Sequence, residues 1–374
     1  MSLTNSRPLG IARIGATLAI LLELRNSADT LRRLAEPGII QAPYFDWAPR
    51  AAEPLSSVLV VLWLVAGLAF GVGLFTRLSG MVLTGTLASV LLLDQQLYSN
   101  HLYLMTLVAG LLTVTDSGAA ISVDAWRGRG KPSVPAWQAW LLKVQVSIVY
   151  GFAAIAKLNL DFLAGSVVAS YLRRSGPLAV PEDWRFVQPM MVLALLAICM
   201  EAFVAVALWL PRWRPAAMVV AIALHVGITG WLEPTYALGV FSVLMLPLLL
   251  VFLDVEPGHH VVVWDDGCGF CATWVKWFRR LDWLHALEFV PRSRLAASGL
   301  PVSEDEAARA LQLVTPRGVR AGFAAVTRIA EVLPVGYLWA PLLRMPPVAF
   351  VGERAYRRVA ARRLCSLRPI VASA

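Results

Sequence analysis

The chain has 374 residues, of which 58% are hydrophobic and 15% are charged, and its formal net charge is +9. This composition excludes a water-soluble globule for most of the chain, because soluble domains carry about 25% charged residues. No nucleic-acid recognition motif accompanies the positive charge, so no nucleic acid is expected among its partners.

Apolar runs of the length that crosses a bilayer follow one another from the N-terminus to about residue 253. A helix needs about 20 such residues to span about 30 Å of hydrocarbon. The runs cover residues 9–24, 55–74, 78–97, 102–115, 137–156, 187–209, 214–231 and 237–253. They predict an α-helical membrane bundle of about eight helices in contact with membrane lipids. We expect a multi-pass protein of a bacterial-type inner (plasma) membrane.

Four ionisable side chains in or beside these runs are candidates to line a membrane cavity: His101, Lys157, Glu201 and His225. A charge in hydrocarbon is costly unless it pairs or faces a cavity, so such residues indicate function. The alternative is that they lie near helix ends and are satisfied by backbone carbonyls or water. The sequence leaves both interpretations open.

Three segments of this region carry a resemblance to a known family: 99-SNHLYLMTL-107, 150-YGFAAIAKLNLDFLAG-165 and 225-HVGITGWLEPTYALGVFSVLM-245. They resemble the HTTM domain, the membrane domain shared with vitamin K-dependent γ-glutamyl carboxylases. The resemblance implies that Lys157 is a base towards a reduced quinone and that His101 serves the same chemistry. A bound quinone, similar to vitamin K, is therefore the cofactor that the resemblance implies.

The match departs from the family at one position and in one region. Phe162 stands where a tryptophan is usual, and nothing in the chain supplies the large soluble region with which the carboxylases present glutamate. Carboxylation is therefore not carried over as the leading interpretation. A carboxylase-like enzyme centred on Lys157 stays an alternative.

The composition changes near residue 255, and no later apolar run is long enough to span a bilayer. We therefore expect a transmembrane domain at residues 1–254 and a small soluble domain at 255–374. Short loops on one side of the bundle are basic, and the opposite short loops carry no Lys or Arg, which predicts a cytoplasmic C-terminal domain. An odd number of spans would place that domain on the other side.

The stretch 261-VVVWDDGCGFCATWVKWFRRLDWL-284 contains two of the four cysteines. Residues 259–265 are typical of a strand, and apolar residues recur at helical spacing from Ala272. Cys268 is then expected at the start of a helix, where the backbone N–H groups favour a thiolate, and Cys271 one turn further in. This spacing suits reversible dithiol chemistry, in which one thiol attacks and the other resolves the mixed disulfide.

Two other interpretations of the cysteine pair are open. The cysteines can simply pack in a core, or they can bind zinc together with His259, His260 or Cys365. Two cysteines are only half of a tetrahedral zinc site and no second Cys-x-x-Cys follows, so we predict no metal. Dithiol exchange needs no cofactor.

The segments after the cysteines suit a small α/β domain. Residues 287–290 are a second strand candidate, 311–323 predicts a hairpin around Pro316-Arg317-Gly318, and helices are expected at 324–332 and 348–363. One β-α-β unit followed by a hairpin and a helix is similar to a short thioredoxin architecture.

The motif Asp265, Cys268 and Cys271 resembles that of the DCC family of thiol-disulfide oxidoreductases, and the match covers about residues 257–365. Trp264 stands where a tyrosine is usual in that family. Asp265 has two candidate roles. It either relays a proton to the resolving thiol, which requires burial, or it shapes the turn as a cap.

The leading prediction is an integral membrane thiol-disulfide oxidoreductase in which Cys268 attacks and Cys271 resolves. Its partner would be a redox partner protein or a lipid-soluble substrate, and a sharper hypothesis is that the dithiol reduces a quinone near Lys157 and His101. A non-catalytic assembly or maturation factor is the alternative from another class. Basic residues near the C-terminus form either a solvated face or a contact with anionic headgroups: Arg354, Arg357, Arg358, Arg362 and Arg363.

Overall fold

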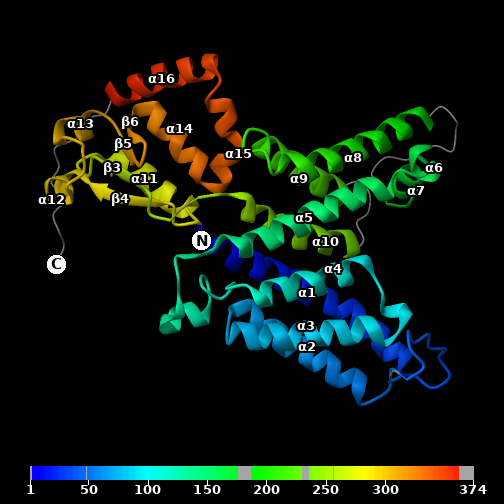
Figure 1. The fold of residues 1–374 in the computed structure, drawn as a ribbon. Helices are drawn as coiled ribbons and strands as arrows, with labels where there is room; N and C mark the ends of the chain where they lie inside the picture. Colours follow the sequence, from blue (N-terminus) through cyan, green and yellow to red (C-terminus); the bar gives the residue numbers. More distant parts are fainter. Residues whose placement is uncertain (1, 48, 176–186, 230–235, 256, 362–374) are drawn as a thin grey trace. The chain divides into compact units, whose positions relative to one another are not determined.

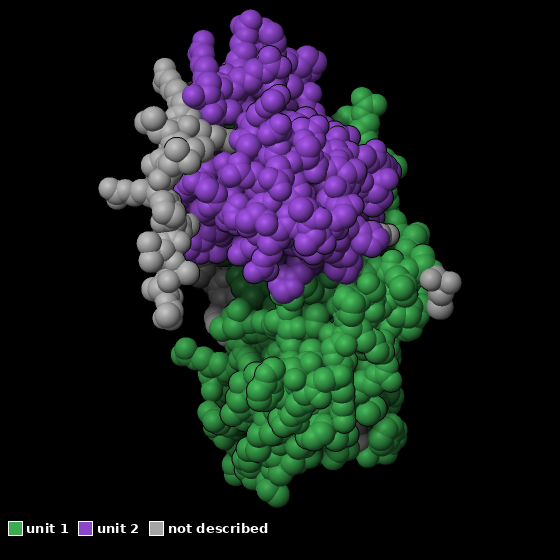
Figure 2. Space-filling model, turned by 90° about the vertical axis from the view of Figure 1, so that its left-hand side faces the viewer, with its two compact units in different colours: residues 1–252 green, residues 253–374 purple. Residues whose placement is uncertain are grey.

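The computed structural model describes residues 2–47, 49–175, 187–229, 236–255 and 257–361 (Figure 1). The chain divides into two compact units, Met1–Phe252 and Leu253–Ala374 (Figure 2). The first unit is built of helices, with only one short antiparallel strand pair, β1 (Leu3–Asn5) and β2 (Ser133–Pro135), among its described residues.

Each predicted apolar run is mainly helical over its described residues in unit 1. The main helices are α1 (Arg7–Leu34), α2 (Leu55–Val72), α3 (Thr76–Leu93), α4 (Asn100–Val114), α5 (Ala136–Ala156), α8 (Val187–Ala207), α9 (Arg214–Gly227) and α10 (Tyr236–Leu248). Among the described residues, four are long and apolar enough to cross a membrane, namely α2, α3, α5 and residues 188–207 of α8. The bundle is therefore that of a membrane protein, and α4, α9 and the region of α10 are apolar helices of only 10–17 residues.

Polar caps explain why some helices are shorter than the apolar runs. The run at 78–97 is interrupted because Asp94 adopts an extended backbone, and its carboxylate accepts the N–H groups of Ala42 at 2.6 Å and Gln96 at 2.8 Å. The short 3₁₀ helix η1 (Gln95–Leu97) follows, and the Ser99 hydroxyl then caps α4. An apolar composition alone does not reveal these caps.

Helix α1 is central to unit 1 and packs against α2, α4 and α10. Its buried residues include many small ones, which let neighbouring helices approach closely, as is usual between helices in membranes. The closest approach is at Gly15, where an added Cβ would lie 2.3 Å from Cγ of Pro247 in α10. Many side chains of α2 face outward, including Val61 and Val65, which suits a surface that lipid covers.

The C-terminal end of α5 lies next to the middle of α8 and not next to an end of α8. After the chain leaves α5, Asn159 caps the short α6 (Leu160–Leu163), and Gly165 turns the chain with a φ of 76°. An added Cβ at Gly165 would lie 2.6 Å from the backbone of Met190, so glycine is required for both reasons. Helix α7 (Ser166–Ser175) then runs along α8.

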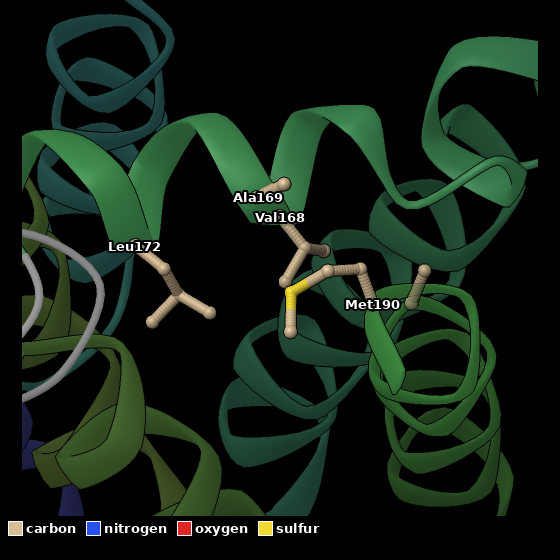
Figure 3. Packing of buried hydrophobic residues seen from close by; sticks show 5 residues of the cluster. Val168, Ala169, Leu172 and Met190 are labelled. Carbon is tan, nitrogen blue, oxygen red and sulfur yellow. The ribbon is translucent and has the colours of Figure 1, made fainter. Parts of the chain in front are cut away.

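A small hydrophobic cluster fixes α7 against the first turns of α8 (Figure 3). It consists of Val168, Ala169 and Leu172 from α7 and Met190 and Ala194 from α8. This contact holds the broken segment that follows α5 in place.

Unit 2 has a four-stranded mixed sheet in the order β4-β3-β5-β6. The strands are β3 (His260–Trp264), β4 (Leu287–Pro291), β5 (Gln312–Thr315) and β6 (Gly318–Ala321). Strands β3 and β4 are parallel, and the pairs β3–β5 and β5–β6 are antiparallel. Besides the 3₁₀ helix η6 (Arg292–Arg294), the described residues of the unit form six α-helices: α11 (Gly269–Leu281), α12 (Leu295–Ser298), α13 (Glu304–Arg309), α14 (Gly322–Val332), α15 (Pro334–Leu343) and α16 (Pro346–Ala361). This is the predicted thioredoxin-like arrangement.

The predicted elements of unit 2 are found with small shifts. Helix α11 begins at Gly269 with Cys268 as its extended N-cap residue, so the predicted helix start at Cys268 is confirmed. Helices α12, α13 and α15 were not predicted. Ser303 and Glu306 form a capping box at the start of α13, a pattern that is visible in the sequence. Residues 253–259 connect Phe252 to β3.

The Gly15 contact can be tested with a matched pair of glycines. We expect Gly15→Ala to destabilise the protein by about 1–3 kcal/mol, because the methyl group would overlap the rigid ring of Pro247. Gly151→Ala in α5 is the control, since an added Cβ there meets no atom within 4 Å. Thermal unfolding in detergent measures both, and equal melting temperatures for the two variants would contradict the packing.

Candidate functional site

Cys268 and Cys271 lie at the start of α11, directly after the strand β3 and a tight turn. Cys268 is the N-cap residue; its N–H donates to the carbonyl of Asp265 at 3.2 Å, and its carbonyl accepts the N–H of Ala272 at 3.0 Å. Cys271 lies in the first turn of the helix. The sequence therefore placed both cysteines at the correct end of the correct helix.

Both thiols are buried. Cys268 is 2% exposed and Cys271 is 6% exposed. The helix N-terminus favours a thiolate on Cys268, and burial in an apolar environment opposes it. An external disulfide can react only after the surface over Cys268 opens, so access controls the reactivity of this pair.

Asp265 belongs to the turn that presents Cys268. Its side chain is buried, and its Oδ1 accepts the N–H of Gly267 at 3.3 Å and lies 3.5 Å from Nη1 of Arg292. Of the two predicted roles, the turn-forming role has these contacts. The proton-relay role stays a prediction.

Asp266 ties the same turn to the segment after β4. Ser293 donates its N–H to Oδ1 of Asp266 at 3.3 Å. Burial opposes ionisation of Asp266, but the hydrogen bonds from Ser293 and the positive charge of Arg292 outweigh it, so the pKa of this carboxyl is lowered from its ordinary value. The turn is thereby anchored at both of its aspartates.

Arg292 and Ser293 were not singled out from the sequence, although a signal was present. Strands β3 and β4 are parallel neighbours, and Trp264 pairs with Pro291 at their carboxyl ends. Residues that follow two adjacent parallel strands meet at the same edge of a sheet. Asp265 and Arg292 each follow their strand directly, so the β-α-β prediction already implied their contact.

In unit 1, the structure brings together two of the predicted cavity residues, Lys157 and Glu201. Nζ of Lys157 lies 2.8 Å from each carboxylate oxygen of Glu201 and also donates to the carbonyl of Ala153 at 3.2 Å. The ring of Phe162 lies 5.7 Å from Nζ. Glu201 is 7% exposed and Lys157 is 27% exposed, so this ion pair is largely removed from solvent.

The contacts of Lys157 bear on the predicted quinone chemistry. An ammonium group has three donors, and all three are directed to Glu201 and Ala153. A base towards a quinone needs an available lone pair on this nitrogen, which in the structure faces these three acceptors. The role of Lys157 as a base and the bound quinone both stay predictions.

His101 pairs with a different carboxylate. Its Nε2 lies 3.2 Å from Oε2 of Glu23 in α1, and Glu23 is 2% exposed. The other oxygen of Glu23 accepts from Asn26 and Ser27, each at 3.3 Å. The pair therefore joins the start of α4 to the middle of α1.

His225 lies in a third polar group. Nε2 is 2.9 Å from the hydroxyl of Tyr150, and Nδ1 is 3.1 Å from the hydroxyl of Ser242, which in turn lies 2.9 Å from Oγ1 of Thr229. Both ring nitrogens thus have partners, and His225 is 1% exposed. Tyr150 and Ser242 were not predicted, because each contact crosses between helices: Tyr150 is 75 residues from His225 and Ser242 is 17 residues from it.

The remaining predicted thiols and ligands lie elsewhere. Cys199 is exposed in α8, and Cys365 lies outside the described residues. Within the part of the chain that the structure describes, no group of three or more His, Cys, Asp or Glu residues is placed to hold a metal ion.

Comparison with known families divides the sequence in two. The model of the HTTM domain matches residues 2–256, and the model of the DCC1-like thiol-disulfide oxidoreductase matches residues 262–368. No solved structure matches the chain.

The ion pair in unit 1 leads to a stability prediction. We expect Lys157→Met to destabilise the protein by about 1–3 kcal/mol, because it leaves the carboxylate of Glu201 buried without its cation. The double variant Lys157→Met with Glu201→Leu should recover part of this loss, since no lone charge remains. Thermal unfolding of both variants in detergent measures the coupling, and strictly additive losses would show that the two side chains do not interact.

The turn of unit 2 leads to a pH prediction. Because the pKa of Asp266 is lower in the folded state, its ionisation stabilises the fold above the ordinary carboxyl pKa, and this stabilisation is lost as the pH falls through the lower folded-state value. Asp266→Asn should therefore reduce the free energy of unfolding at neutral pH. It should also make that free energy fall less steeply as the pH is lowered. Denaturant unfolding followed by tryptophan fluorescence at several pH values measures this, and parallel pH profiles for the two proteins would contradict it.

Proposed function

This chain belongs to the HTTM domain family and carries a DCC1-like thiol-disulfide oxidoreductase domain, and from that premise we propose that it is an integral membrane oxidoreductase acting through Cys268 and Cys271. The observation that carries the proposal is the position of the two cysteines. Cys268 caps α11 at the end of a parallel strand and Cys271 lies in the first turn of the same helix. A non-catalytic assembly factor would not need this arrangement.

The exchange proceeds in two steps. The Cys268 thiolate attacks one sulfur of a partner's disulfide, forming a mixed disulfide and releasing one thiol. The Cys271 thiolate then attacks Sγ of Cys268 and releases the second thiol. The partner gains two electrons and two protons, and the dithiol becomes the Cys268–Cys271 disulfide. The partner of this exchange therefore carries a disulfide, either on a redox protein or on a smaller molecule.

We place this domain on the cytoplasmic side of a bacterial-type inner membrane, on the basis of the basic short loops. In a reducing compartment the pair would rest as a dithiol and act as a reductant. Reporter enzymes fused after Ala361 test on which side of the membrane the domain lies. A reporter that works only in the cytoplasm should be active in this fusion, and a reporter that works only outside the cytoplasm should be inactive. The reverse result would make the pair an oxidant in an oxidising compartment.

A redox titration tests the chemistry itself. We expect the protein in detergent to show one reversible two-electron transition across glutathione ratios, followed by thiol alkylation and mass. Cys268→Ser and Cys271→Ser should each abolish it, because an intramolecular disulfide needs both sulfurs.

Cys199→Ser provides the matched control, since Cys199 is a cysteine of the same chain in a membrane helix. It should leave the transition intact. Persistence of the transition in Cys271→Ser, or its absence from the unmodified protein, would remove the proposed function.

A further inference from the structure

A groove of about 410 Å³ runs along α11 from the turn that bears the cysteines. It is lined by Trp264, Ala272, Val275, Lys276, Arg279 and Arg280. The volume is within the range of sites that take small molecules, roughly 300–1,000 Å³. Neither the family matches nor the dithiol chemistry assigns a role to it.

The groove is positively charged. Three of its lining residues are cations, Lys276, Arg279 and Arg280, and no carboxylate lines it. The guanidinium of Arg279 lies 5.0 Å from the ring centroid of Phe289, and that of Arg280 lies 5.5 Å from the ring centroid of Trp277. Among the described residues, none of the three cations forms an ion pair. Their charge is therefore available to a ligand.

Trp264, which lines the groove, also carries an unused donor. Its indole Nε1–H is buried and has no hydrogen-bond partner among the described residues. A buried donor without an acceptor costs about 1–3 kcal/mol. An acceptor group of a ligand that reaches this donor would remove that cost. Three positive charges and an unsatisfied donor all favour an anionic ligand with oxygen acceptors.

The groove is adjacent to the dithiol. Ala272 follows Cys271 directly, and its N–H donates to the carbonyl of Cys268 at 3.0 Å. At about 1.5 Å per helical residue, Lys276 lies about 12 Å along the helix from Cys268. An extended peptide covers about 3.3–3.6 Å per residue. Once the surface over Cys268 opens, a ligand of about three to four peptide units therefore spans the distance from its sulfur to Lys276.

We propose that this groove binds the carboxylate of a small peptide disulfide and holds its sulfur near Cys268, so that the substrate class of the dithiol is an anionic, low-molecular-weight disulfide. This inference rests on the proposed function for its redox step. Arginine suits the task because its planar fork of N–H donors pairs with a carboxylate through two hydrogen bonds.

The redox step is the same two-step thiol-disulfide exchange as in the proposed function, and its atoms and electrons balance in the same way. Cys268 attacks one sulfur of the bound disulfide and one peptide thiol leaves, taking a proton. Cys271 then closes the protein disulfide and the second peptide thiol leaves with the second proton. Two electrons pass from the dithiol to the substrate. The groove takes no part in bond breaking and acts only on binding and orientation.

The first test compares disulfides of different charge. In the Cys199→Ser protein, the dithiol is oxidised with oxidised glutathione, which is anionic, with bis(2-hydroxyethyl) disulfide, which is neutral, and with cystamine, which is cationic. Each rate is divided by the rate of the same disulfide with free dithiothreitol. The anionic disulfide should be preferred, and the triple variant K276Q/R279Q/R280Q should lower the ratio of anionic to neutral rates by about tenfold or more.

A matched control removes the same charge elsewhere in unit 2. The variant R354Q/R357Q/R358Q changes three arginines of α16, which packs on α14 and α15. It should keep the preference of the parent protein. An equal fall in both triple variants would mean that overall charge, rather than the groove, sets the preference, and this would overturn the inference.

A binding measurement separates the groove from the redox activity. S-methylglutathione has no reactive sulfur, and its binding should change tryptophan fluorescence in a saturable way that is lost in Trp264→Phe and in K276Q/R279Q/R280Q. Binding without any dithiol oxidation would refute the proposed function and keep the groove assignment. Oxidation of the dithiol at equal corrected rates by all three disulfides, without saturable binding, would refute the groove and keep the proposed function.

Discussion

A charged group that leaves water needs a partner, and this requirement fixes the arrangement of unit 1. Arg13 in α1 is fully buried, and its guanidinium donates to the carbonyls of Ser117 and Ile121 in the connection after α4. In the same connection, the carboxylate of Asp124 accepts both the N–H and the hydroxyl of Thr76 and so caps α3. Each contact joins segments far apart in sequence. The polar residues therefore determine how the apolar helices are paired.

The same requirement explains the break after α5. Backbone without helical hydrogen bonds is tolerated at membrane depth only where protein buries it or where it lines a cavity. Here the ion pair of Lys157 and Glu201 lies at that break. The side chain of Asn159 caps α6, the helix that follows the break, and the hydrophobic cluster around Met190 packs against the next segment. The break is thus held by contacts with α8. The pair has a structural role in this arrangement, whichever molecule unit 1 binds.

Features that depend on local sequence patterns were predicted from the sequence, and contacts between distant segments were not. Apolar runs, the strand before Cys268, the hairpin after Leu311 and the helix start were all predicted because spacing and turn residues encode them. The pairing of Glu23 with His101, of Lys157 with Glu201 and of Tyr150 with His225 was not predicted, because helical periodicity says which face a residue occupies and not which helix lies opposite. Arg292 lies between these cases, since the parallel strand pair implied its place.

Residues 253–259 are the whole connection between the last helical turn of unit 1 and the first strand of unit 2. Even fully extended, a segment of this length reaches only about 25 Å. The start of β3 therefore stays within about 25 Å of the end of unit 1, and we expect the dithiol to react close to the membrane surface. A partner that is itself anchored in the membrane meets the dithiol by lateral diffusion in two dimensions, at a high effective concentration. A soluble partner has to reach this surface from the bulk, so the short connection gives an advantage to substrates that already belong to the membrane surface.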